Sequence, residues 1–297
     1  MTPLRKRFIE DMQIRNRSEK TISAYVGHAV RFARYFGRSP MELGHEETRQ
    51  YQLHLLEQKV SWSNFNQCVC ALRFLYGITL NRPEVVARLP YGRRPKRLPV
   101  VLDRQEVLEL FACVRHFKAR MVLTTMYATG MRIDEAVHLG VADIDSRRMS
   151  ILVARGKGNK QRMVPLTPAL LSELRSWWQE HRNPVWIFPG KHPDRPVAAD
   201  SIQRACKQAV ARAGLKKAAT PHSLRHTFAT ELLEADVEVL IIQQILGHTS
   251  LRTTARYTHV RRNHLQKASQ VLDLLPLAEL LTDRPWRTAP RRPASAR

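Results

Sequence analysis

Six residues beyond position 130 carry side chains that could act together on a phosphodiester. Arginine forks bind the nonbridging oxygens of a phosphate through paired hydrogen bonds, and cationic donors stabilise the charge of a pentacoordinate phosphorus. A tyrosine hydroxyl can attack the phosphorus and later depart. Because the set contains no carboxylate that would hold Mg²⁺, it predicts phosphoryl chemistry without a metal ion. The six residues are Arg132, Lys157, His222, Arg225, His248 and Tyr257.

Each of these residues alone also has an ordinary structural interpretation. Lys157 lies between two glycines at an expected hairpin tip, where a lysine is commonly just part of a turn, and the spacing of a Walker loop is absent. His222 and Arg225 share one face of a helix N-terminus, an end that favours anions. His222 and His226 have the spacing of a metal site, but no HExxH glutamate accompanies them, so a structural His226 is favoured and no metal is expected.

The chain is strongly basic. Its 297 residues include 49 Lys and Arg against 26 Asp and Glu, which gives a formal net charge of +23. This charge favours a polyanionic partner, most commonly nucleic acid, over a merely basic solvated surface. Positive residues recur on the first long helix and in a proline-rich segment, where we expect phosphate contacts. The candidate DNA-binding residues are Lys20, Arg31, Arg34, Arg93, Arg94, Lys96 and Arg97.

The composition argues against several other classes of protein. No run approaches the roughly 18 apolar residues of a membrane span, and no apolar signal segment follows the basic N-terminus. The four cysteines form no CxxC pair, so neither a zinc knuckle nor a redox pair is indicated. These features suit a reducing, cytoplasmic location.

Hydrophobic spacing predicts an all-helical first region. One helix is expected between Ser18 as the N-cap and Gly37 as the stop, and two more over residues 46–59 and 61–80. The stretch 89–99 has three prolines and should be extended, because proline fixes φ and removes a donor. We interpret it as an interdomain linker that lies along a phosphate backbone.

The second region combines helices with one hairpin. It opens with a capping box at Asp103. Apolar residues alternate with polar ones over 151–153 and 163–165, which predicts two paired strands. Leu233 and Leu240 are expected to face the core. Helices are expected over residues 120–128, 172–181, 201–213, 221–233, 237–245, 250–257 and 265–275.

Taken with their surrounding boxes, the six positions resemble the tyrosine recombinase (phage integrase) family. The resemblance covers most of the chain, and all six catalytic positions occur in family order. The first-arginine box differs slightly, with Met131 where leucine is usual and Asp134 where serine is frequent. The matching boxes are residues 128–135, 156–162, 221–230, 246–248 and 256–259.

The resemblance implies how the covalent step would proceed. Tyr257 would attack the scissile phosphate, forming a 3′-phosphotyrosyl bond and freeing a 5′-hydroxyl. Lys157 would protonate the leaving 5′-oxygen, and His222 would serve as base or proton carrier for the tyrosine. Because the partner strand's 5′-hydroxyl reverses the reaction, no nucleotide cofactor would be needed.

The remaining matched residues would hold the phosphate. By position, Arg132 and Arg225 would bind its nonbridging oxygens, and His248 would donate a hydrogen bond to it. Glu135 would orient the arginine from behind, without touching the phosphate.

The resemblance also implies an architecture that is mainly α with a small β-sheet, in a layout close to Xer-type and transposon-encoded recombinases. An all-helical, SAM-like core-binding domain would precede a mixed α+β catalytic domain. The family works as a homo-tetramer on two DNA sites, and the helix after the tyrosine, about 264–275, would dock on a neighbouring subunit. The expected segments are a domain at 3–88, a basic linker at 89–99, a catalytic domain at 100–275 and a basic, disordered tail at 276–297.

Two alternative functions remain open at this point. A metal-free, type IB-like DNA relaxing enzyme would use the same pocket without exchanging strands. A catalytically silent DNA-binding regulator would keep the fold and lose the chemistry, although the completeness of the six positions argues against it.

Overall fold

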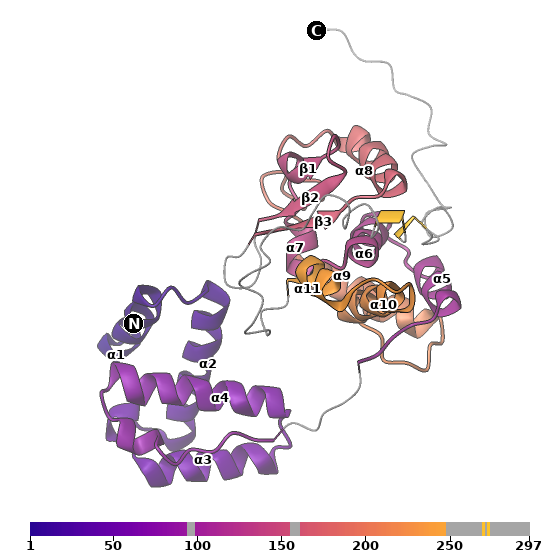
Figure 1. Cartoon of the computed structure of the whole chain (residues 1–297). Coiled ribbons are helices and arrows are strands. Elements are labelled where there is room, and N and C mark those ends of the chain that lie inside the picture. The colour runs from indigo at the N-terminus through magenta and orange to yellow at the C-terminus, as the bar shows by residue number, and fades with distance from the viewer. Residues whose placement is uncertain (94–98, 155–160, 248–268, 271, 274–297) are drawn as a thin grey trace. The chain divides into compact units, whose positions relative to one another are not determined.

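The computed structural model describes residues 1–93, 99–154, 161–247, 269–270 and 272–273 (Figure 1). The chain separates into two compact units, Met1–Arg97 and Leu98–Arg297. Within the described residues, no helix is both long and apolar enough to cross a bilayer.

The first unit is entirely helical in its described part. Ser18 caps its longest helix by accepting a hydrogen bond from the Thr21 amide, and Gly37 ends that helix in the left-handed conformation at φ 64°, both as predicted. The fourth helix continues into a π-helical turn at Leu75–Thr79. The helices are α1 (Pro3–Ile14), α2 (Glu19–Phe36), α3 (His45–Glu57) and α4 (Trp62–Phe74).

Aromatic side chains form the centre of this unit. Phe32 of α2 is fully buried, and its ring meets those of Tyr51 and Tyr76 edge to face, with centroids 5.2 and 6.3 Å apart. The Tyr76 hydroxyl donates to the Pro40 carbonyl at 2.9 Å, so burial of this ring leaves its polar end paired. These contacts fix α2, whose outer side carries Arg31 and Arg34.

The first residues of the predicted linker are fastened to the first unit. Asn66 pairs with both backbone groups of Gly92, donating to its carbonyl at 2.9 Å and accepting from its amide at 2.8 Å. Gln52 donates to the Pro90 carbonyl at 3.1 Å, and Arg73 donates to the Leu89 carbonyl at 2.7 Å. Residues 89–92 are therefore held against the helices of this unit.

The second unit joins seven helices to a three-stranded antiparallel sheet of order β1-β2-β3, counted over the described residues. The mainly α fold with a small sheet is therefore confirmed. Strand β1 was not predicted; it adds to the expected hairpin by pairing Ile144 with Ile151. The elements are α5 (Arg104–Ala112), α6 (Phe117–Thr129), α7 (Ile133–Val137), β1 (Ile144–Asp145), β2 (Ser150–Val153), β3 (Arg162–Pro165), α8 (Pro168–His181), α9 (Ala199–Arg212), α10 (Pro221–Glu234) and α11 (Val239–Leu246).

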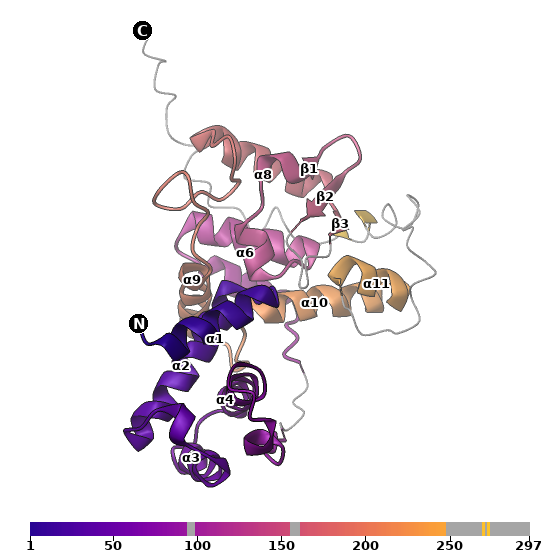
Figure 2. The same ribbon diagram turned by 90° about the vertical axis from the view of Figure 1, so that its left-hand side faces the viewer.

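Helix α6 lies in the middle of the second unit, with the sheet and α8 on one side and α9 and α10 on the other (Figures 1 and 2). Every residue from Ala119 to Thr129 is buried. A helix buried on all sides positions its C-terminal end rigidly, and that end leads directly to Arg132. Leu272, in the predicted 264–275 helix, is also buried in the core of this unit.

Two inward-facing residues were predicted wrongly. Leu233 is 47% exposed and Leu240 is 44% exposed. Helix α10 ends at Glu234, and Asp236 then takes a positive φ of 56°, so the helical repeat does not continue into α11. The next helix starts at Val239, and its new phase turns Ile241, rather than Leu240, toward the core.

Candidate active site

The turn between α6 and α7 places Arg132. Gly130 ends α6 with φ +66°, and a Cβ atom at this position would lie 2.6 Å from the Phe228 ring, so only glycine fits. Arg132 is the N-cap residue of α7, and its amide donates to the Glu135 carboxylate at 2.8 Å. This reach-back contact is local, and it fixes both the backbone and the carboxylate beside it.

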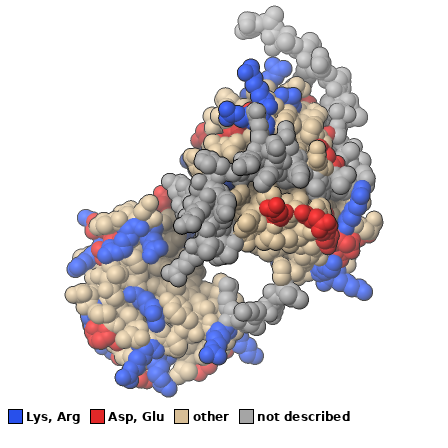
Figure 3. All heavy atoms as spheres, in the orientation of Figure 1, with Lys and Arg blue, Asp and Glu red and all other residues tan. Residues whose placement is uncertain are grey.

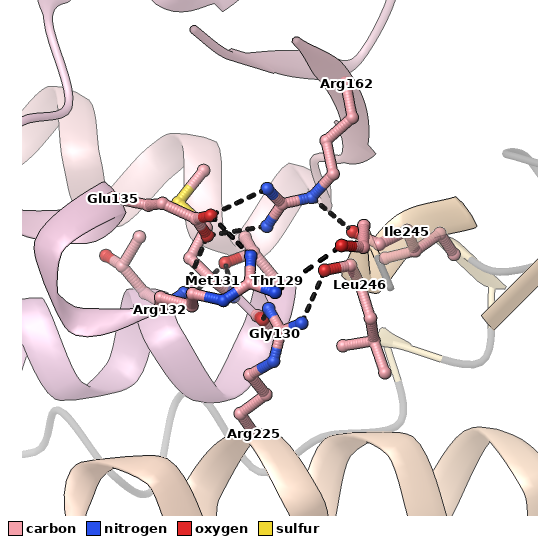
Figure 4. Close-up of polar contacts among 11 residues, drawn as sticks. Thr129, Gly130, Met131, Arg132, Glu135, Arg162, Arg225, Ile245 and Leu246 are labelled. Carbon is pink, nitrogen blue, oxygen red and sulfur yellow. Dashed lines mark hydrogen bonds and ion pairs between the residues drawn. The ribbon is translucent and has the colours of Figure 1, made fainter. Parts of the chain in front are cut away.

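Glu135 forms ion pairs with two arginines of the site. Its oxygens accept from Arg132 Nη1 at 2.8 Å and from Arg162 Nη1 and Nη2 at 2.8 and 2.6 Å, as Figure 4 shows. Burial alone would raise the pKa of Glu135, but the hydrogen bonds from Arg162 and Arg132 outweigh it and lower that pKa to about 2. The carboxylate is therefore ionised at neutral pH and behaves as a fixed anion.

Arg225 enters the site from the first turns of α10. It is 2% exposed, and its Nη1 donates to the Gly130 carbonyl at 2.5 Å. Its Nη2 donates to the Leu246 carbonyl at the end of α11. Burial, with the charges of Arg132 and Arg162, lowers the pKa of Arg225, but a guanidinium remains protonated in proteins.

Arg162 is a third arginine of the site that the sequence did not single out. It lies on β3, and besides its fork to Glu135 its Nε donates to the Ile245 carbonyl at 2.6 Å. Three arginines thus surround one carboxylate in the described part of the chain. The excess positive charge is suited to an anion such as a phosphate.

His222 lies in the first turn of α10, one turn before His226. The two rings meet edge to face with centroids 4.6 Å apart. Loss of hydration and the charges of His226, Arg225 and Arg132 lower the pKa of His222, so the neutral imidazole, which can accept a proton, predominates at neutral pH. Where the structure describes the chain, no three His, Cys, Asp or Glu side chains cluster in a way that could hold a metal ion.

The structure thus brings together Arg132, Arg225 and Glu135 among the predicted site residues, with His222 on the same helix as Arg225. Lys157, His248 and Tyr257 lie outside the described residues. The elements that lead to two of them are described, since β2 and β3 flank residues 155–160 and α11 ends at Leu246, two residues before His248. The roles of these three residues stay predictions.

The candidate DNA-binding residues lie on the first unit and the linker. Lys20, Arg31, Arg34 and Arg93 are exposed. Figure 3 shows Lys and Arg side chains at several places over the visible face of this unit. Arg31 is held in place by the buried His28, whose Nδ1 is 3.1 Å from Arg31 Nη2. The remaining three, Arg94, Lys96 and Arg97, lie outside the described residues.

Comparison with known proteins identifies the class. Residues 100–264 match the phage integrase family, and residues 4–84 match the phage integrase N-terminal SAM-like domain. The chain belongs to the phage integrase family, which confirms the resemblance, and it is a tyrosine-type site-specific recombinase.

Individual relatives match along nearly the whole chain. The protein y4qK of Sinorhizobium fredii, a candidate integrase/recombinase, is 45% identical over 278 residues, covering 93% of this chain and 90% of the relative. Tyrosine recombinase XerA of Pyrococcus furiosus is 30% identical over 278 residues, covering 90% and 93%. The fold is similar to that of a lambda integrase dimer bound to a core site, at a TM-score of 0.68 and 18% identity over 83% of this chain and 94% of that one.

The ionised state of Glu135 predicts a pH-dependent contribution to stability. Because its pKa in the folded state lies near 2, below the unfolded value of 4.5, its stabilisation is full above pH 4.5 and is lost as the pH falls toward 2. Glu135→Gln removes the carboxylate that pairs with Arg132 and Arg162. We expect it to lower the free energy of unfolding by about 3 kcal/mol at pH 7.

Urea unfolding of wild type and variant between pH 2 and 7 measures this difference. It should shrink as the pH falls below 4.5, while the exposed control Glu180→Gln should follow wild type throughout. Equal unfolding free energies for Glu135→Gln and wild type at pH 7 would contradict the assigned ion pairs.

Proposed function

We propose that this protein cuts DNA at specific sites and rejoins it through a covalent 3′-phosphotyrosyl intermediate. The observation that carries the proposal is the cluster of Arg132, Arg162 and Arg225 beside one carboxylate, that of Glu135, in the part of the site that the structure describes. A dianionic transition state at phosphorus needs this excess of fixed positive charge.

The two candidate phosphate-binding arginines have N–H donors that their contacts within the protein do not use. A guanidinium has five N–H donors, and the contacts of Arg225 with Gly130 and Leu246 use two of them. Arg132 uses one side-chain donor for Glu135 and another for the Gly247 carbonyl at 3.4 Å. Its side chain is 27% exposed, so the remaining donors can be reached from solvent. The protein contacts orient the forks before the phosphate arrives.

The covalent step follows from the matched positions. The Tyr257 oxygen would form a bond to phosphorus while the bond to the 5′-oxygen breaks. His222 would take up the tyrosine proton, and Lys157 would deliver a proton to the departing 5′-oxygen. His248 would donate a hydrogen bond to the phosphate. Attack by a 5′-hydroxyl of the partner strand then restores the phosphodiester and frees the tyrosine.

The proposed partner is double-stranded DNA, held by a homo-tetramer that brings two sites together. A lambda integrase tetramer bound to a Holliday junction has the same fold at a TM-score of 0.67 and 17% identity, over 87% of this chain and 79% of that one. In the proposed complex the first unit and the linker provide the phosphate contacts through their basic residues.

A covalent-complex assay tests the function and separates the alternatives. The substrate is a nicked suicide duplex built on inverted repeats found by sequencing the flanks of the gene. A recombinase gives a denaturation-resistant protein–DNA adduct and also joins a second duplex. A relaxing enzyme gives the adduct without joining, and a silent regulator gives no adduct, so either result would contradict the proposal.

Cleavage should not depend on divalent metal. The pocket offers cations where metal-dependent nucleases offer carboxylates. We expect EDTA to leave adduct formation unchanged on a pre-nicked half-site, which removes effects on synapsis. Loss of cleavage in EDTA that is reversed by Mg²⁺ would show that the pocket has been misassigned.

The linker charges should contribute to DNA affinity. Replacing Arg93, Arg94, Lys96 and Arg97 by Gln should flatten the dependence of log K on log salt, by up to about 0.9 for each DNA phosphate that is no longer neutralised. Binding titrations between 50 and 300 mM salt (about a sixfold range, enough to define a slope) measure it, with circular dichroism as the folding control. A slope equal to that of wild type would place these charges in solvent.

A further inference from the structure

The C-terminal end of α11 is held by arginines from three different elements. The carbonyls of residues 245, 246 and 247 accept, in order, from Arg162 of β3, Arg225 of α10 and Arg132 before α7. The last carbonyls of a helix lack partners within the helix, and the negative end of its dipole favours cations. Figure 4 shows the side chains converging on this end from separate parts of the unit.

Arg162 differs from the other two in what it joins. Its two terminal nitrogens hold both oxygens of Glu135, at 2.8 and 2.6 Å, while its Nε holds the Ile245 carbonyl at 2.6 Å. One planar group therefore fixes the distance between Glu135, which orients Arg132, and the end of α11. The packing is close, because a Cβ atom on Gly247 would lie 3.0 Å from Arg162 Cδ.

We propose that Arg162 is a positioning residue for strand cleavage. It holds Arg132 and the chain leading to His248 at fixed positions relative to each other. The inference rests on the proposed function, and it adds a residue to which the family resemblance gave no role. Arg162 acts through Glu135 and Ile245, and not through the phosphate.

The partners of the side chains support this division of roles. Arg225 donates to the carbonyls of Gly130 and Leu246, whereas Arg162 pairs with both oxygens of the Glu135 carboxylate. Three of its five N–H donors are already used by Glu135 and Ile245. Lysine could supply the same charge but no planar fork, so it could not hold a carboxylate and a carbonyl at fixed relative positions.

Arg162→Lys is therefore the informative variant, because it keeps the charge and removes the geometry. At saturating suicide DNA we expect its single-turnover cleavage rate to fall roughly 10- to 100-fold, the range seen when a group that orients a functional residue is removed. Its DNA dissociation constant should stay within about twofold of wild type, because the phosphate contacts that dominate affinity are unchanged. Arg175→Lys, at an exposed arginine of α8, is the matched control and should behave as wild type.

Two modified substrates separate positioning from a simple loss of folded protein. A methylphosphonate at the scissile position removes the negative charge that Arg132 must hold, so the Arg162→Lys defect should shrink on it. A 5′-bridging phosphorothiolate changes only the leaving group, so the defect should persist there. A smaller folded fraction would lower the yield of adduct equally on all three substrates and leave the cleavage rate constant unchanged, and that result would overturn the inference.

A double variant tests the path through the carboxylate. If Arg162 acts through Glu135, adding Arg162→Lys to Glu135→Gln should slow cleavage little beyond the slower single variant. Fully multiplicative effects, or a wild-type rate for Arg162→Lys alone, would overturn the inference while leaving the proposed function intact. Absence of any adduct with wild-type protein would overturn the proposed function, and this inference with it.

Discussion

Tyr257→Phe is expected to bind DNA with wild-type affinity and to form no covalent adduct. The substitution keeps the aromatic ring and removes only the hydroxyl that would attack phosphorus. No other residue stands at the nucleophile position of the matched box, 256–259. The adduct should therefore drop below detection on a denaturing gel, while a mobility-shift titration gives an unchanged dissociation constant.

Tyr91→Phe provides the control. Tyr91 is 51% exposed at the start of the linker, and its hydroxyl has no proposed part in the chemistry, so this variant should form adduct at the wild-type rate. Adduct formation by Tyr257→Phe would remove Tyr257 from the role of nucleophile.

Lys157→Ala should cleave ordinary DNA roughly 10²- to 10⁴-fold more slowly than wild type, because this is the usual contribution of a positioned general acid. An alkoxide is a poor leaving group, and Lys157 is proposed to protonate it. A 5′-bridging phosphorothiolate departs as a thiolate without that proton. We therefore expect the sulfur substrate to restore most of the missing rate in Lys157→Ala.

Arg132→Ala supplies the comparison for this rescue. Its contacts to the nonbridging oxygens are needed with either leaving group, so it should stay impaired on both substrates. If Lys157→Ala cleaves the sulfur substrate as poorly as ordinary DNA, Lys157 is a binding residue. The role of acid would then pass to Lys160 or a histidine.

The parts of the fold that follow from short-range rules could be predicted from the sequence. Ser18 and Gly37 delimit α2, and Gly130 ends α6, because caps and left-handed stops depend on residues within one turn. The contact between Arg132 and Glu135 is also local, since the two are three residues apart, but it was the family resemblance that indicated it.

Features that depend on distant contacts could not be predicted in this way. Arg162 pairs with Glu135 across 27 positions and with Ile245 across 83, and no local pattern marks either contact. Leu233 and Leu240 were wrongly placed inside because each adjoins a buried residue, Leu232 and Ile241. One step along a helix turns a side chain by about 100°, so the packing of each helix decides which of the two neighbours is buried.

The most direct test of the central claim is to identify the atom that carries the DNA. Wild-type protein trapped on the suicide duplex would be digested with protease and nuclease, and the adducted peptide sequenced by mass spectrometry. The account predicts a nucleotide joined through its 3′-phosphate to the peptide that contains Tyr257, with a free 5′-hydroxyl on the other product. A nucleotide on any other residue, or a 5′-phosphate on the released strand, would contradict it.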